Sequence, residues 1–97
     1  MARFDYHRVD GDLLLDCQAD THRHLNSRVV APLLLPEEVP SGLGRLHPIF
    51  EVEGEQRVLA THLLTAMPLR TLGHPAGSLR ANQDEIMSAL DMLLTGF

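Results

Sequence analysis

The six histidines of this 97-residue chain are the side chains best suited to bind a metal ion or to transfer protons at neutral pH. His22 and His24 would project both rings to one side of an extended segment, as two metal ligands must. Further ligands are missing, because the sequence has no cysteine pair and no His-Glu-x-x-His motif. The other histidines are scattered along the chain: His7, His47, His62 and His74. We therefore predict no metal site and no cofactor.

One thiol and several carboxylates are the remaining candidates for chemistry. Cys17 lies on the apolar side of a predicted strand, where a thiol is usually an inert core residue. The pair Glu37-Glu38 and the three glutamates between 51 and 55 flank predicted turns, where carboxylates are usually solvated. Neither group indicates a reaction, so we predict no catalytic residue and a protein that is not an enzyme.

Composition limits the classes of partner. Thirteen acidic residues against eight arginines give a formal net charge of −5, which disfavours direct binding to DNA. Cys17 is the only cysteine, and no long apolar run suggests a signal or a membrane span. We expect a cytoplasmic protein with no membrane contact, folded as one domain over residues 1–97 and assembled as a homodimer that buries further apolar surface.

Alternating polarity predicts two hairpins that would position these side chains. Residues 3–8 alternate as in a half-buried strand, with Phe4 and Tyr6 on one side and Arg3, Asp5 and His7 on the other, exposed side. Asp10-Gly11 suits a tight turn before a second strand with Leu13, Leu15, Cys17 and Ala19 on one face. Residues 46–53 alternate in the same way, and Glu53-Gly54-Glu55 returns the chain through residues 56–60.

The segments between and after these hairpins are less regular. Asp20 to Ser27 is a polar turn region, whereas Arg28 to Leu35 predicts a strand with a bulge or an edge at Pro32. Residues 36–44 predict an ordered surface loop. The run Leu69 to Leu72, bracketed by Met67-Pro68 and Gly73, favours a strand over a helix.

One amphipathic helix is predicted from Ser78 onward. Ile86, Leu90, Leu93 and Phe97 recur at helical spacing, and Ser78 or Asn82 suits the start of the helix as a cap. Phe97 either makes an exposed contact, turned outward by the freedom of Gly96, or packs on its own barrel or a dimer seam. Short strands followed by one terminal helix predict a mostly β fold, a small antiparallel barrel with the helix packed alongside.

Five pieces of the chain resemble consecutive motifs of CcdB toxins, in the same order and at similar intervals. They are residues 15–20 (LDCQAD), 28–33 (RVVAPL), 46–49 (LHPI), 67–73 (MPLRTLG) and 86–97, which begin IMSAL and end in Gly96-Phe97. The resemblance covers nearly the whole chain. It implies an SH3-like barrel with a C-terminal helix, the CcdB/MazF-type toxin fold, assembled as a homodimer with the two helices at its centre.

The same resemblance implies the toxin of a type II toxin–antitoxin system. CcdB toxins insert the end of the C-terminal helix at the dimer interface of the DNA gyrase A subunit and stabilise cleaved DNA. A partly disordered CcdA antitoxin neutralises them, and the assembly represses its own operon through CcdA, so operator DNA is contacted only indirectly. An acidic toxin fits this division of labour.

The family's gyrase-binding residues can be placed on this chain by position. The family has a Trp-Gly-Ile ending, an Asn and a Phe earlier on the helix, and an Ile-Ile pair after the second strand. Gly96 alone is unchanged. Thr95 and Phe97 occupy the Trp and Ile positions, Asp91 and Leu94 those of Asn and Phe, and Thr21-His22 those of the Ile pair. A threonine does not provide the large flat surface of a buried tryptophan.

Two other functions compete with gyrase poisoning. MazF and Kid ribonucleases share the superfamily fold, and an arginine such as Arg28 with a His or Asp would support RNA cleavage, although their sequence motifs are not matched. A non-toxic protein that keeps only the fold and antitoxin binding is the third reading.

Overall fold

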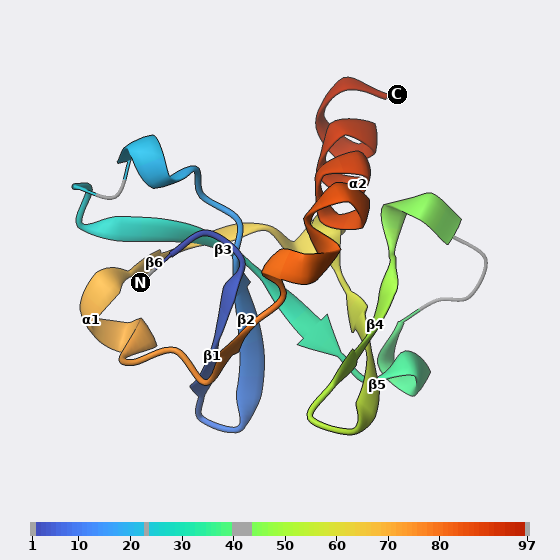
Figure 1. Cartoon of the computed structure of the whole chain (residues 1–97), viewed down its shortest axis with the longest axis horizontal. Helices are drawn as coiled ribbons and strands as arrows, with labels where there is room; N and C mark the ends of the chain where they lie inside the picture. The colour runs from blue at the N-terminus through green and yellow to red at the C-terminus, as the bar shows by residue number, and fades with distance from the viewer. Residues whose placement is uncertain (1, 23, 40–43, 97) are drawn as a thin grey trace.

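The computed structural model describes residues 2–22, 24–39 and 44–96, which form a mostly antiparallel sheet followed by a helix (Figure 1). The strands are β1 (Asp5–Val9), β2 (Asp12–Asp16), β3 (Ser27–Leu34), β4 (Ile49–Val52), β5 (Glu55–Leu59), β6 (Thr65–Pro68) and β7 (Gly77–Ser78). The α-helices are α1 (Leu69–Leu72) and α2 (Gln83–Thr95). Short 3₁₀ turns are η1 (Asp20–His22), η2 (Pro36–Glu38), η3 (Gly44–Leu46), η4 (Thr61–Leu63) and η5 (Arg80–Asn82).

Both predicted hairpins are confirmed. β1 pairs with β2, and β4 pairs with β5, each antiparallel across a two-residue turn. Asp10 and Gly11 have φ of 51° and 87°, and Glu53 and Gly54 have φ of 54° and 83°. Two successive residues with positive φ give a turn whose twist matches that of the strands it joins.

β3 is the central strand. The irregularity predicted at Pro32 is found instead in the chain that lies opposite Pro32. The first half of β3 pairs with β6 and the second half with β5, while β2 pairs along the other side. The chain inserts η4 between β5 and β6, at the level where Pro32 accepts a hydrogen bond from the Ala60 N–H at 2.9 Å. The irregularity therefore lies in the chain that pairs with β3, where η4 separates β5 from β6. Pro32, which has no N–H, is tolerated in β3 because the chain opposite it turns away at η4.

The prediction of a strand over Leu69 to Leu72 is wrong, because these residues form the single turn α1. Pro68, with φ of −60°, precedes the turn, and Gly73, with φ of 63°, ends it. The Leu69 N–H donates to the Asn26 carbonyl at 2.9 Å, which fixes the start of α1 beside β3. A four-residue run is too short for periodicity to separate helix from strand.

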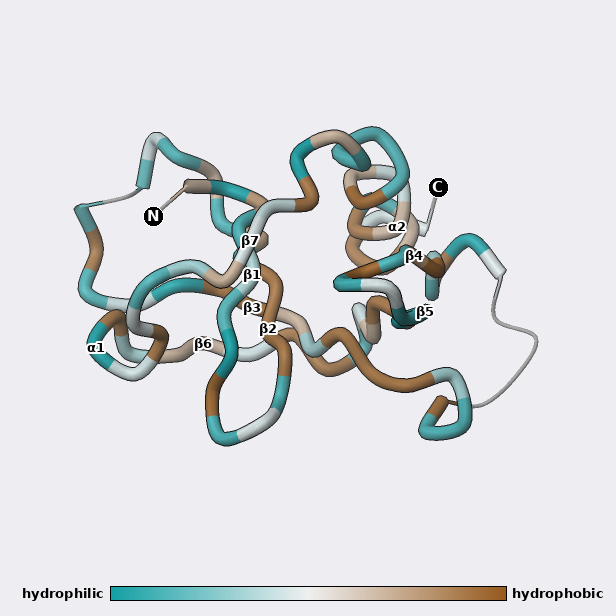
Figure 2. Tube along the Cα trace, turned by 60° about the horizontal axis from the view of Figure 1, so that its bottom comes forward, coloured by the Kyte–Doolittle hydropathy of each residue, from teal (hydrophilic) through white to brown (hydrophobic). Residues whose placement is uncertain are grey.

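Two apolar layers form on the two faces of the sheet, and Figure 2 shows the apolar residues of β2 beside those of β3. The main core joins β1, β2, β4 and β5 to α2, with Leu15 and Ile86 fully buried. A smaller cluster on the other face contains Leu14, Val30 and Leu72 of α1. The sequence placed His7 on an exposed side of β1, which is wrong: α1 covers that side, and His7 is completely buried.

The terminal helix is confirmed, with a later start than Ser78. The Ser78 hydroxyl accepts the Arg80 N–H at the start of η5, and Asn82 precedes α2 without a side-chain cap. Asp84 and Glu85 lie in the first turn of α2, where negative charge is favourable. The fold class is thus the predicted one, a curled half-barrel with a C-terminal helix. Within the described residues, no helix is long and apolar enough to cross a membrane.

Candidate partner-binding site

The last turn of α2 presents the most exposed large apolar side chain that the structure describes. Leu94 is 71% exposed, and Asp91, Thr95 and Gly96 are exposed around it. Residues three and four apart on a helix are neighbours, so Asp91, Leu94 and Thr95 share one face. Figure 1 shows this end of α2 projecting away from the strands. Four of the predicted site residues therefore lie together, whereas Phe97 lies outside the described residues.

Hydrogen bonds within the helix decide which groups remain available at this end. The Thr95 hydroxyl donates to the Asp91 carbonyl at 2.7 Å, so it is already partnered. Gly96 has φ of 81° and its N–H donates to the Met92 carbonyl at 3.0 Å, a left-handed termination that glycine adopts without strain. The free surface of the last turn is consequently the Leu94 side chain flanked by the Asp91 carboxylate.

The other two predicted site residues lie elsewhere in the chain. Thr21 and His22 are exposed on η1, which both views place well away from the C-terminal end of α2 (Figures 1 and 2). Thr21 instead lines a hollow of about 320 Å³ with Gln83 and Met87 from the first turns of α2. One copy of the chain does not bring the two parts of the predicted site together.

A buried ion pair supports the segment that carries Thr21 and His22. Arg28 and Asp16 are 1% and 0% exposed, and 2.7 Å separates Arg28 Nη2 from Asp16 Oδ2. They lie on paired strands on either side of that segment. Burial raises the pKa of the Asp16 carboxyl, against the opposing effects of the Gln18 N–H and Arg28. Sequence reasoning missed this pair, because charged residues at these positions read as solvent-facing.

Gln18 links the ion pair to η1. Its backbone carbonyl lies 3.5 Å from Arg28 Nη2, and its side-chain oxygen accepts the Val29 N–H at 3.2 Å. Its side-chain nitrogen donates to the His22 carbonyl at 2.9 Å. The position of η1 therefore depends on contacts that begin at Arg28.

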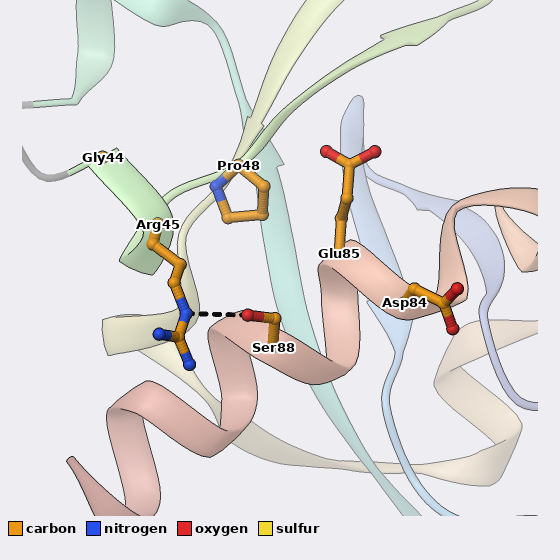
Figure 3. Close-up of a pocket in the computed structure, with 6 residues that line it drawn as sticks. All are labelled: Gly44, Arg45, Pro48, Asp84, Glu85 and Ser88. Atoms are coloured by element: carbon orange, nitrogen blue, oxygen red, sulfur yellow. Dashed lines mark hydrogen bonds between the residues drawn. The ribbon is translucent and has the colours of Figure 1, made fainter. Parts of the chain in front are cut away.

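A second hollow, of about 370 Å³, lies beside the first half of α2, and its lining comes from η3, the following segment and the helix (Figure 3). Arg45 Nε donates to the Ser88 hydroxyl at 2.7 Å across it. The lining residues are Gly44, Arg45, Pro48, Asp84, Glu85 and Ser88. This hydrogen bond fixes η3 against α2. Nothing in the sequence pattern indicated it.

The reactive residue types that the structure describes do not form a catalytic constellation. Cys17 is buried as predicted, and burial raises the pKa of its thiol to about 12, which keeps it protonated and unreactive at neutral pH. Within residues 2–22, 24–39 and 44–96, no three His, Cys, Asp or Glu side chains gather as a metal site would require. Arg28, suggested above for RNA cleavage, is enclosed and paired with Asp16.

Comparison with known families gives a match over nearly the whole chain. The family model described as "CcdB protein" matches residues 3–96. No curated protein matches the chain.

Proposed function

Because the chain belongs to the CcdB family of toxin–antitoxin toxins, we propose that it binds and poisons DNA gyrase and is neutralised by a CcdA-like antitoxin. The observation that carries this proposal is the exposed end of α2, where Leu94 extends from the fold with 71% of its surface free. A large apolar side chain presented on a rigid helix is suited to dock in a hydrophobic groove of a partner protein. The match over residues 3–96 includes this end of the helix.

The apolar anchor in this chain is proposed to be Leu94, in place of the family's tryptophan. Thr95, at the tryptophan position, has its hydroxyl bonded to the Asp91 carbonyl and offers little apolar surface. Leu94 is its neighbour on the same turn and is free. Asp91, Leu94, Thr95, Gly96 and Phe97 are accordingly proposed as the helix part of the gyrase A subunit contact.

A homodimer is proposed to supply the second part of the contact. Thr21 and His22 lie far from the end of α2 in one copy, so they contribute to the same site only if a second copy places its η1 nearby. Two features support a second copy at the helix: Met92 and Leu93 are only half-buried, and Leu63 on η4, which contacts α2, is 46% exposed. Pairing would bury this apolar surface.

Binding, and not catalysis, is proposed as the mode of action. Ribonuclease chemistry needs a cationic side chain that reaches the RNA phosphate, and Arg28 is 1% exposed. The net charge of −5 likewise disfavours direct contact with nucleic acid, which leaves operator DNA to the antitoxin.

Inducible expression in a bacterium whose gyrase is susceptible tests this function. We expect growth to stop after induction and to continue when a CcdA-like antitoxin that binds the protein is expressed with it. Total RNA from the arrested cells should remain intact, since the protein acts on gyrase. Unimpaired growth would favour a non-toxic protein that has kept the fold, and arrest with cleaved RNA would favour the ribonuclease.

A further inference from the structure

Two histidines that are fifteen residues apart in the sequence meet beside α2. His47 Nε2 and His62 Nδ1 are 2.8 Å apart, a hydrogen-bond distance, and the ring centres are 4.7 Å apart. His47 is 6% exposed, whereas His62 on η4 is exposed. Within the part of the chain that the structure describes, the remaining ring nitrogen of His47, Nδ1, is buried and has no hydrogen-bond partner.

This unpartnered nitrogen determines which histidine donates. If His47 Nε2–H donates to His62 Nδ1, then His47 Nδ1 carries only a lone pair. In the opposite tautomer His47 Nδ1–H would be a buried donor without an acceptor, which is the more costly arrangement. The favoured state therefore has His47 as donor and His62 Nδ1 as acceptor, with both rings neutral.

Adding a proton to this pair destabilises it. On His62 Nδ1 it would direct two N–H groups at each other with no acceptor between them. On His47 Nδ1 it would create a buried charge without a partner. Each protonated form of the pair thus either breaks the bond between the rings or places an N–H at the buried, unpartnered His47 Nδ1, so the neutral pair is the most stable one.

The pair joins the two turns that support α2. His47 directly follows η3, His62 lies within η4, and both turns contact the helix. A second bond joins the same turns, because the Thr61 hydroxyl donates to the Leu46 carbonyl at 2.7 Å. η3 is in turn fixed to the helix through Arg45 and Ser88 (Figure 3). Among the described residues, loss of the ring contact leaves the bond from Thr61 to Leu46 as the remaining side-chain hydrogen bond between the two turns.

We propose that His47 and His62 form a proton-sensitive latch that holds α2 in place at neutral pH and releases it in mildly acidic solution. The sequence gives no sign of it, since neither residue belongs to a recognisable motif. The latch is a property of the fold itself. It affects gyrase binding only if the proposed function is right, because that function assigns the contact to α2.

The surrounding charges are consistent with release of the latch at lower pH. The other charged side chains on the described elements packed around the pair are Arg28 on β3, Arg45 on η3, Glu51 on β4, Glu55 and Arg57 on β5, and Asp84, Glu85 and Asp91 on α2. The pKa of His47 is lowered by its burial and by the charge of His62. The folded protein therefore holds fewer protons at His47 than the unfolded chain below the usual value of about 6.5. The stabilisation is complete above that pH and is lost as the pH falls through the lowered pKa.

Amide hydrogen exchange of α2 tests the latch without gyrase or antitoxin. Protection factors of Ala89 and Leu90, corrected for the intrinsic pH dependence of exchange, should fall about three- to tenfold between pH 7.5 and pH 5.5, the effect of losing one hydrogen bond. The double variant His47→Gln with His62→Asn keeps an N–H donor near the Nε2 position and an acceptor near the Nδ1 position and has no ring to protonate, so its protection should stay high at both pH values. His62→Ala should show reduced protection at both.

His74→Asn is the matched control, because His74 is an exposed histidine outside the pair, and it should behave like the unaltered protein. Protection that does not change with pH in the unaltered protein would overturn the proposal. So would a fall in the double variant as large as that in the unaltered protein, or full protection in His62→Ala at pH 7.5. Since gyrase is absent, failure here leaves the proposed function untouched, and failure of gyrase poisoning leaves the latch untouched.

Discussion

Replacing Arg28 with methionine should lower the free energy of unfolding by roughly 3–5 kcal/mol, because it leaves a buried carboxylate without its counter-charge. Asp16 is 0% exposed, and Arg28 Nη2 at 2.7 Å is its only cationic partner among the described residues. Methionine fills a similar volume, so the loss reports the missing charge more than a cavity. Urea unfolding at pH 7 measures the change.

The double variant Asp16→Asn with Arg28→Met separates charge from packing. It removes both buried charges and keeps an oxygen for the Gln18 N–H, which Asp16 Oδ1 accepts at 3.0 Å. We expect it to recover most of the lost stability, since replacing a whole buried pair by neutral groups is often close to neutral. Arg8→Met is the matched control, because Arg8 pairs with Glu53 at the surface and should matter by about 1 kcal/mol or less. A double variant no more stable than Arg28→Met, or an Arg8→Met loss of equal size, would contradict this account.

Replacing Leu94 with serine should weaken binding to the purified gyrase A subunit by about 30-fold, the effect of removing one interface anchor worth about 2 kcal/mol. The fold should be nearly unaffected, with a change within about 0.5 kcal/mol, because Leu94 is 71% exposed and has little to lose. Isothermal titration gives the dissociation constant, and thermal melting checks the fold.

Leu69→Ser is the control for Leu94→Ser. Leu69 is 37% exposed on α1, which Figure 1 places on the opposite side of the molecule from the end of α2. This variant should bind gyrase like the unaltered protein. If both serine variants bind equally well, Leu94 is not the anchor. If Leu94→Ser unfolds or becomes monomeric, the side chain packs in a dimer seam instead.

Local patterns predicted the hairpins and the terminal helix because neighbouring residues determine the structure of these elements. Two-residue turns such as Asp10-Gly11 require positive φ, and few residue types adopt it readily. The spacing of Ile86 and Leu90 fixed the buried face of α2, and both are buried. The strand period likewise placed Leu13, Leu15 and Cys17 in one core layer, where the structure has them.

The errors arose where distant segments decide the environment. His7 is buried because α1, more than sixty residues later in the sequence, covers its side of β1. Pro32 interrupts nothing in β3, since its partner strand turns away there. The pairing of His47 with His62, and that of Asp16 with Arg28, depends on strand register and on the η4 insertion. These contacts join segments that are apart in the sequence, so no local stretch of residues predicts them.

For the candidate site, the resemblance to CcdB toxins placed the residues at the end of α2 and on η1. The structure groups Asp91, Leu94, Thr95 and Gly96 and separates them from Thr21 and His22. Whether each side chain is free or already hydrogen-bonded could not be predicted from the sequence, because it depends on contacts such as the bond from the Thr95 hydroxyl to the Asp91 carbonyl. That bond is the reason why Leu94, and not Thr95, is proposed as the anchor.

The most direct test of gyrase poisoning is a cleavage assay with the purified protein, DNA gyrase, ATP and supercoiled plasmid. After denaturant and protease treatment, we expect linear plasmid to accumulate with increasing protein, and much less with Leu94→Ser. Total RNA incubated with the same protein should stay intact. Absence of linear product at saturating protein, or cleavage of the RNA, would contradict the proposed function.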